Sequence, residues 1–353
     1  MPYIILILFI LTSTLCFLEH RLSKKYNITI YITLGVILII LAGLREVGID
    51  PDSDNYEAAY RNYYSSNMLG SVDYSFLLLS NLFNLFTTDV HALFLFYALF
   101  GVAFKFMAFR QHSSYYFLPI VVYLSFYYEL HELTQIRTGI MSGLFLLAIK
   151  PITEGKRFKA FLLILAGSFF HISAIILLPF LFLKSKPLNM KWKILLIALI
   201  PTAYVISTLL TNTTLTSSIP YIGDKLILYQ KAEQMGTASV SVNIVSPLLM
   251  LSIFIYYYLI IFSKAIEQKL NCYPILIKIL GVALFSYIAL SFLPVLAERV
   301  CYLLRIVIVL LFPAISYTIR PRWIGMIIVM LISIIFMNYG LRLLDFVFLW
   351  EVS

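Results

Sequence analysis

Charged residues are scarce in this sequence. They make up 12% of its 353 residues, while 61% are hydrophobic; a soluble domain carries about 25% charged residues. Apolar runs long enough to cross about 30 Å of hydrocarbon recur along the chain, and no stretch between them is long enough for a separate soluble domain. The sequence therefore predicts a single transmembrane domain over residues 1–353.

Cysteine is rare and nucleotide-binding motifs are absent. The three cysteines, Cys16, Cys272 and Cys301, show no paired spacing, so neither a disulfide framework nor a zinc site is indicated. The sequence has no glycine-rich phosphate loop and no G-x-S-x-G elbow, which disfavours chemistry driven by a cytosolic nucleotide. The net charge of +9 is assigned to membrane topology, and no nucleic-acid partner is expected.

The sequence instead predicts about 12 hydrophobic helices, which is typical of an all-α polytopic membrane protein. The first 18 residues lack a basic n-region and a cleavage site, so we expect them to remain as the first helix. Apolar length and Lys/Arg flanks place the helices at 2–18, 28–44, 90–109, 115–130, 133–149, 158–169, 172–183, 193–210, 244–262, 274–297, 300–319 and 323–340.

The segment 158–183 is interpreted as a short helical hairpin. Four basic residues precede it and four follow it: Lys150, Lys156, Arg157 and Lys159, then Lys184, Lys186, Lys191 and Lys193. Two strongly basic flanks favour the same, cytoplasmic side, so the chain between them turns back, with His171 near the tip. A single span of 26 residues with one basic flank outside is the alternative.

This topology gathers most of the 26 Lys and Arg residues on the cytoplasmic side, Lys105 among them, and most of the 17 acids outside. The outer loop 45–89 contains an apolar stretch, 74–86, that is too short to span and favours an interfacial or re-entrant helix. The outer loop 211–243 is rich in Thr, Ser and Asn, and is either a lid over a site or a solvated connector.

Charged side chains at membrane depth are costly, and those that persist are functional candidates. Arg45 directly follows the second helix, and Asp50, Asp52 and Asp54 follow it with the spacing of the first ligands of a calcium loop. The glycine and the bidentate glutamate that such a loop requires are absent, so we expect no metal. The alternative to a functional role for this stretch is a solvated acidic turn, which accounts for the aspartates but not for Arg45 at the end of an apolar helix.

A second polar stretch contains Glu132, Gln135 and Arg137. Gln135 stands where a zinc-protease helix has its second histidine, which argues against a metal. An arginine at the membrane surface can grip a phosphate with a planar fork of donors. A structural pair between Arg137 and Glu132 is the alternative.

Two further candidates lie further along the chain. His171 is either a catalyst or a hydrogen-bonded packing residue. Glu298, Tyr302 and Arg305 share one helical face, and Arg299 lies beside them. Arg299 and Arg305 are predicted near the outer start of a helix, whereas the basic residues that anchor a helix are typically on the cytoplasmic side. The two arginines therefore indicate an anion site.

Four short motifs, in this order, resemble those of the EpsG-type, Wzy-like polysaccharide polymerases: Arg45-x-x-Gly48-x-Asp50 with Tyr56 downstream, Gln135-x-Arg137, Phe-His171-x-Ser-Ala before Pro179, and Arg299-x-x-Tyr302. The resemblance covers roughly residues 30–310. Family members commonly have a glutamate-glycine pair near the interfacial segment, where this chain has Asp73-Tyr74.

The resemblance implies a multi-pass enzyme of the bacterial inner membrane with a fold akin to the C-type glycosyltransferases. Such an enzyme joins O-antigen or exopolysaccharide repeat units carried on undecaprenyl pyrophosphate, at the periplasmic face and without a cofactor. Its expected partners are the lipid-linked donor and acceptor, membrane lipid and a chain-length regulator. A lipid-linked oligosaccharide flippase or transporter and a non-catalytic assembly subunit are the alternatives.

The resemblance also suggests roles for the candidate residues. The pyrophosphate, whose charge develops as it leaves, would be bound by the outer arginines, namely Arg45, Arg137, Arg299 and Arg305. The base for the acceptor hydroxyl would be His171, Asp50 or Glu132. The glycan would contact Asp54, Tyr56, Gln135 and Tyr302. A flippase would instead need charges along a path to the cytoplasmic side, and an assembly subunit would have no such cluster.

Overall fold

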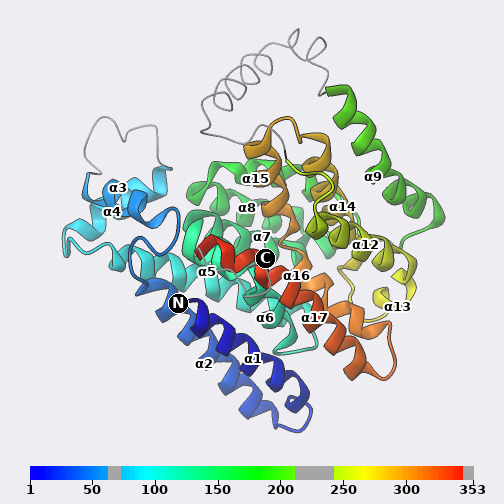
Figure 1. Cartoon of the computed structure of the whole chain (residues 1–353), viewed down its shortest axis with the longest axis horizontal. Helices are drawn as coiled ribbons and strands as arrows, with labels where there is room; N and C mark the ends of the chain where they lie inside the picture. Colours follow the sequence, from blue (N-terminus) through cyan, green and yellow to red (C-terminus); the bar gives the residue numbers. More distant parts are fainter. Residues whose placement is uncertain (63–72, 211–241, 345–353) are drawn as a thin grey trace, which may run out of the picture. The chain divides into compact units, whose positions relative to one another are not determined.

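The computed structural model describes residues 1–62, 73–210 and 242–344. The regular elements in these ranges are all helices (Figure 1), which confirms the predicted all-α class. Within these ranges, six helical stretches are long and apolar enough to cross a membrane, judged by length and composition: Lys24–Gly43, His91–His112, Ile136–Thr153, Met190–Leu210, Pro294–Tyr317 and Arg322–Leu341. The stretch Pro294–Tyr317 is made of several successive helical elements. Shorter apolar helices accompany them, including Pro2–Leu18 and Tyr273–Ala289.

The chain forms two compact units. The first comprises Met1–Ser185, Lys269–Cys272 and Val309–Ser353, and the second comprises Lys186–Gln268 and Tyr273–Ile308. The helices of the first unit are α1 (Pro2–Leu18), α2 (Lys24–Gly43), α3 (Ser53–Arg61), α4 (Tyr74–Asn84), α5 (His91–His112), α6 (Leu118–Val122), η1 (Tyr123–Tyr127), η2 (Glu129–Thr134), α7 (Ile136–Thr153), α8 (Arg157–Phe170), η3 (Ile172–Phe182), η4 (Pro313–Tyr317), α17 (Arg322–Leu341) and η5 (Arg342–Leu344).

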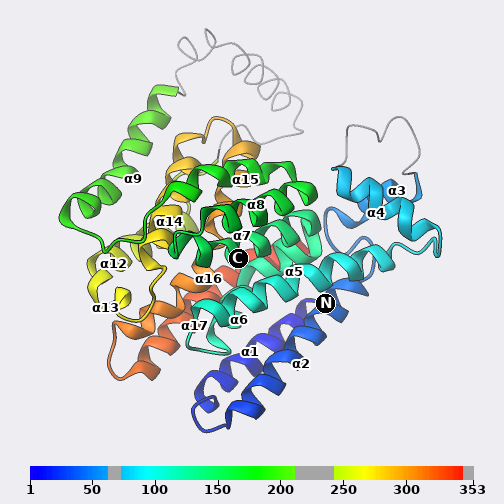
Figure 2. The ribbon, with the colours of Figure 1, turned by 180° about the vertical axis from the view of Figure 1, so that it is seen from behind.

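In the first unit, α5 packs against both α2 and α7, and α7 packs in turn against α8 (Figures 1 and 2). Small residues allow the close approach of α5 and α7. A Cβ on Gly143 of α7 would lie only 2.8 Å from Cβ of Phe104 on α5. Helices in membranes commonly pack through such small residues, because dispersion contacts replace the hydrophobic effect there.

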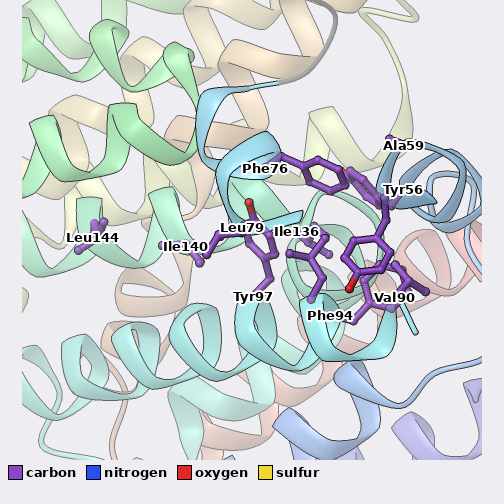
Figure 3. Close-up of a cluster of buried hydrophobic side chains, with 12 residues drawn as sticks. Tyr56, Ala59, Phe76, Leu79, Val90, Phe94, Tyr97, Ile136, Ile140 and Leu144 are labelled. Carbon is purple, nitrogen blue, oxygen red and sulfur yellow. The ribbon is translucent and has the colours of Figure 1, made fainter. Parts of the chain in front are cut away.

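The short helices α3 and α4 pack on one end of α5 through a cluster of buried aliphatic and aromatic side chains (Figure 3). Tyr56 of α3 lies between Phe76 of α4 and Phe94 of α5, with ring centroids 5.6 and 6.5 Å away. A hydrogen bond of 3.2 Å from Asn84 Nδ2 to the carbonyl of Tyr60 joins α4 to α3. The predicted apolar segment 74–86 thus forms a short helix whose inner face is buried.

The segment 158–183 is divided at His171. Helix α8 ends at Phe170, His171 is extended with φ −153° and ψ 123°, and the 3₁₀ segment η3 follows. The two elements pack against each other, and the methyl group of Ala174 lies 3.7 Å from the position of a Cβ on Gly167. His171 therefore lies in an irregular turn between two short helical elements, as the hairpin interpretation predicts.

Two predicted helix boundaries are wrong. The predicted helices 115–130 and 133–149 meet through the π-helical turns η1 and η2, and the chain breaks at Gln135 with φ −97° and ψ 60°. The predicted helices 274–297 and 300–319 divide earlier than expected, because α15 already begins at Pro294, and proline favours the first position of a helix. Arg299 therefore lies inside a helix and not at its start.

The second unit contains α9 (Met190–Leu210), α12 (Pro247–Ile261), α13 (Ser263–Glu267), α14 (Tyr273–Ala289) and α15 (Pro294–Arg305), and α16 (Ile308–Leu311) begins at its last residue. Helix α14 packs against α9, α12 and α15. The outer loop predicted at 211–243, interpreted as a lid or connector, lies outside the described residues except for its last two positions.

Candidate functional site

Three polar side chains from distant parts of the sequence meet in the first unit. Asp73 precedes α4, Arg137 lies in the first turn of α7, and His171 occupies the break between α8 and η3. Oδ2 of Asp73 accepts a hydrogen bond of 2.7 Å from Nη1 of Arg137 and lies 2.8 Å from Nδ1 of His171. We call these three residues the Asp73 cluster.

The side chains of the Asp73 cluster are partly buried but remain accessible to solvent. The side chains of Arg137 and His171 are each 23% exposed, and that of Asp73 is 14% exposed. Contact with Asp73 uses one nitrogen of Arg137, and a guanidinium carries five N–H donors. Donors therefore remain for an anion that approaches from the exposed side.

Asp73 is charged at neutral pH. Burial alone would raise its pKa, but the hydrogen bond and charge of His171, followed by the charge of Arg137, outweigh burial and hold the pKa of Asp73 below its ordinary value. The carboxylate is consequently retained as pH falls through the ordinary aspartate value near 3.9, and it is lost only below that value. At physiological pH it can fix the orientation of both of its partners.

The Asp73 cluster packs against an aromatic side chain, Tyr56. The guanidinium carbon of Arg137 is 5.7 Å from the ring centroid of Tyr56, and Tyr56 is buried among Phe76 and Phe94 (Figure 3). Burial raises the pKa of Tyr56 to about 12, opposed by the charge of Arg137. Tyr56, a predicted glycan contact, is thus a neutral side chain whose ring packs against the guanidinium of Arg137.

Arg45 and Asp50 form a separate, buried ion pair. Nε of Arg45 lies 3.0 Å from Oδ2 of Asp50, and both side chains are inaccessible. Nη1 and Nη2 donate to the carbonyls of Ala42 and Leu133 at 2.7 and 2.6 Å. The second oxygen of Asp50 accepts the N–H of Ser53 at 3.1 Å. This pair joins the end of α2 to the start of α3 and to the backbone before α7.

Replacing Arg45 with alanine is expected to destabilise the protein by about 3–5 kcal/mol, because a buried carboxylate and two carbonyls lose their partner. Thermal unfolding of the purified protein in detergent measures the loss. The control is Arg61→Ala, which removes an arginine from an exposed pair with Glu57 and should cost less than about 1 kcal/mol. Equal stability of the two variants would contradict a structural role for Arg45.

Glu132 lies in another buried pair. Its Oε1 accepts hydrogen bonds from Nζ of Lys105 and, at 2.8 Å, from the hydroxyl of Tyr123. Lys105 also donates to the carbonyl of Gly139 at 2.6 Å. The alternative of an Arg137–Glu132 pair is therefore wrong. Lys105, predicted among the cytoplasmic basic residues, is fully buried and paired with Glu132.

The remaining candidates are more dispersed. Gln135 forms the break before α7, and its carbonyl accepts the N–H of Gly139 at 3.0 Å. Asp54 is exposed on α3. In the second unit, Arg299 is exposed on α15, while Arg305 is buried with its guanidinium carbon 5.1 Å from the ring centroid of Tyr302.

Among residues 1–62, 73–210 and 242–344, no group of three or more His, Cys, Asp and Glu side chains is placed to hold a metal ion. The three aspartates of the calcium-like spacing serve other contacts or face solvent. Asp50 is paired with Arg45, and Asp54 is exposed.

Asp73 is the site residue that the sequence did not single out. It lies 64 residues from Arg137 and 98 from His171, so no local spacing connects it to either. The available signal was its position at the start of the short apolar helix, where the resembling family commonly has a glutamate.

Comparison with known proteins identifies the family of this chain. No curated protein and no solved structure matches the chain. The model of the EpsG family matches residues 28–348, a range that includes all three residues of the Asp73 cluster. The chain therefore belongs to the EpsG family, a family of Wzy-like polysaccharide polymerases.

Proposed function

We propose that the chain joins oligosaccharide repeat units carried on undecaprenyl pyrophosphate, at the periplasmic face of the bacterial inner membrane. The observation that supports this proposal is the Asp73 cluster, in which one carboxylate holds an arginine and an imidazole side by side. Transfer from a lipid pyrophosphate needs a cation for the leaving group and a base for the acceptor hydroxyl.

In the proposed reaction, the acceptor is a sugar hydroxyl of the next lipid-linked unit. Its oxygen forms a bond to the anomeric carbon of the growing glycan, and the bond from that carbon to the pyrophosphate oxygen breaks. The hydroxyl proton passes to the base, and undecaprenyl pyrophosphate departs with the bonding electrons. One lipid pyrophosphate is released for each glycosidic bond formed.

His171 is proposed as the base. Its Nδ1 faces the ionised Asp73 at 2.8 Å, and a carboxylate in this position favours the tautomer with the proton on Nδ1. Nε2 then carries the lone pair that accepts the hydroxyl proton. The negative charge of Asp73 also stabilises the imidazolium that forms, as an aspartate does for the histidine of hydrolytic triads.

Arg137 is proposed to bind the pyrophosphate. Its planar guanidinium can contact two phosphate oxygens at once, and Asp73 and Tyr56 fix its orientation. Arg299 and Arg305 of α15 remain proposed as further pyrophosphate contacts, and Asp54, Gln135 and Tyr302 as glycan contacts. Arg45, Asp50 and Glu132 are better supported as positioning residues, because their charged groups are buried in pairs.

An elongation assay with purified protein in detergent and lipid-linked repeat units tests this proposal. We expect a ladder of lengthened glycans with equimolar release of undecaprenyl pyrophosphate, unaffected by EDTA because arginine stabilises the leaving group. Nucleotide sugars alone should give no product. Movement of the lipid-linked unit across proteoliposomes without lengthening would instead support a flippase, and no activity in either assay would support an assembly subunit.

A further inference from the structure

A second region with the properties of a binding site lies away from the Asp73 cluster, toward the N-terminal end of α2 and the C-terminal end of α5. The two helices enclose an apolar groove of about 690 Å³. Its floor is aromatic: the hydroxyl of Tyr31 donates to the carbonyl of Phe106 at 2.7 Å, and their ring centroids are 4.7 Å apart. Its walls include Ile32, 58% exposed, and Met107, 53% exposed. The groove is therefore open toward the surroundings of the helices.

One end of this groove is basic. Lys24, Arg110, Gln111 and Tyr116 line it. The guanidinium carbon of Arg110 lies 3.7 Å from the ring centroid of Tyr116, and its Nη1 donates to the carbonyl of Tyr115 at 3.1 Å. These contacts hold Arg110 in place while leaving further donors for a ligand.

Positive charge predominates around this end. Arg21, Lys24 and Lys25 are exposed in the turn before α2 and in its first residues. The neighbouring acid, Glu19, is buried and accepts the backbone N–H groups of Tyr116 and Phe117 at 2.9 and 3.4 Å. An apolar groove that ends at fixed and exposed cations is complementary to a molecule with an acyl chain and an anionic head.

The groove is distinct from the Asp73 cluster. The cluster lies near Tyr97, whose hydroxyl is 3.4 Å from Oγ of Ser75, two residues after Asp73. Arg110 lies 13 residues further along α5, which at 1.5 Å per residue is about 20 Å along the helix. A lipid with its head at Arg110 therefore has that head about 20 Å along α5 from the cluster. A lipid-linked donor, with its pyrophosphate at Arg137, does not fit this orientation.

We propose that this groove binds an anionic glycerophospholipid, with its phosphate at Lys24 and Arg110 and one acyl chain along α2 between Ile28 and Ile39. Basic residues attract anionic lipids by about 1 kcal/mol each, which is a factor of about five in affinity. The bound lipid fills the space between α2 and α5 and is neither donor nor acceptor in the polymerase reaction.

Native mass spectrometry of the purified chain with equal amounts of dioleoyl phosphatidylglycerol and dioleoyl phosphatidylcholine tests this inference. We expect preferential retention of phosphatidylglycerol. Lys24→Gln and Arg110→Gln should each reduce that retention about fivefold, and Arg110→Lys should reduce it less. Ile32→Trp should reduce retention of both lipids by filling the groove.

Lys159→Gln, which removes an exposed lysine of α8, is the matched control and should behave as wild type. Because Lys24 and Ile32 are exposed, their variants remain informative if Arg110→Gln fails to fold. Equal retention of the two lipids by the wild type would overturn the proposal. So would wild-type retention in the Lys24, Arg110 and Ile32 variants, or displacement of phosphatidylglycerol by undecaprenyl phosphate.

Discussion

Replacement of Arg137 with alanine should lower the turnover rate of polymerisation by about 10²–10³, because a preorganised donor to the departing pyrophosphate is lost. The loss should fall mainly on kcat, since charge on the leaving group grows as the glycosidic bond breaks. The assay is elongation of lipid-linked repeat units by purified protein, with initial rates measured over a range of acceptor concentrations.

Arg137→Lys separates this role from support of Asp73. Lysine can still pair with the Asp73 carboxylate, but it lacks the planar fork for two phosphate oxygens. We therefore expect wild-type thermal stability with an intermediate rate. Arg61→Ala serves as the control for loss of an exposed arginine. Full activity of Arg137→Ala, or a loss of folded protein that accounts for the whole decrease, would contradict the assignment.

Much of the architecture follows from apolar length alone. The predicted segments 2–18 and 323–340 agree with α1 and α17 to within a residue, because about 17–20 apolar residues with polar flanks have few other arrangements in a bilayer. The errors lie where one apolar run contains two elements. Between α14 and α15 hydrophobicity is continuous, and Pro294 sets the boundary through its backbone and not through its polarity.

The partners of the charged residues were harder to predict. Glu132 precedes Arg137 by five residues, so a local pair was a reasonable hypothesis. The π-helical turn and the break at Gln135 place the two residues on separate elements. Glu132 then meets Lys105, and Arg137 meets Asp73, across 27 and 64 residues of sequence. Such pairings depend on helix packing, which residue spacing does not encode.

The break at His171 was predicted from the basic flanks on both sides of segment 158–183, which favour a turn between them. The partner of His171 was not predicted from the sequence. The structure places the imidazole against Asp73, which changes the hypothesis from an isolated histidine to a histidine oriented by a carboxylate. This pairing also predicts how the two residues should depend on each other in mutational experiments.

His171→Gln should lower the rate of polymerisation by about 10²–10⁴ with normal amounts of folded protein. Glutamine keeps a hydrogen bond to Asp73 and an approximate size, but it cannot accept the proton of the acceptor hydroxyl. His20→Gln, which changes a histidine with a 69% exposed side chain, is the matched control and should retain wild-type activity. Retained activity in His171→Gln would assign the imidazole to packing and would contradict its role as the base.

The double variant His171→Gln/Asp73→Asn tests whether Asp73 acts through the histidine. Asp73→Asn alone should reduce the rate strongly, because asparagine cannot stabilise the imidazolium and can favour the wrong tautomer. In the His171→Gln background the same change should cost little, since residues that act as one unit are not additive. If Asp73 served only to hold α4 and α7 in place, its replacement would lower thermal stability and reduce the rate by the same factor in both backgrounds.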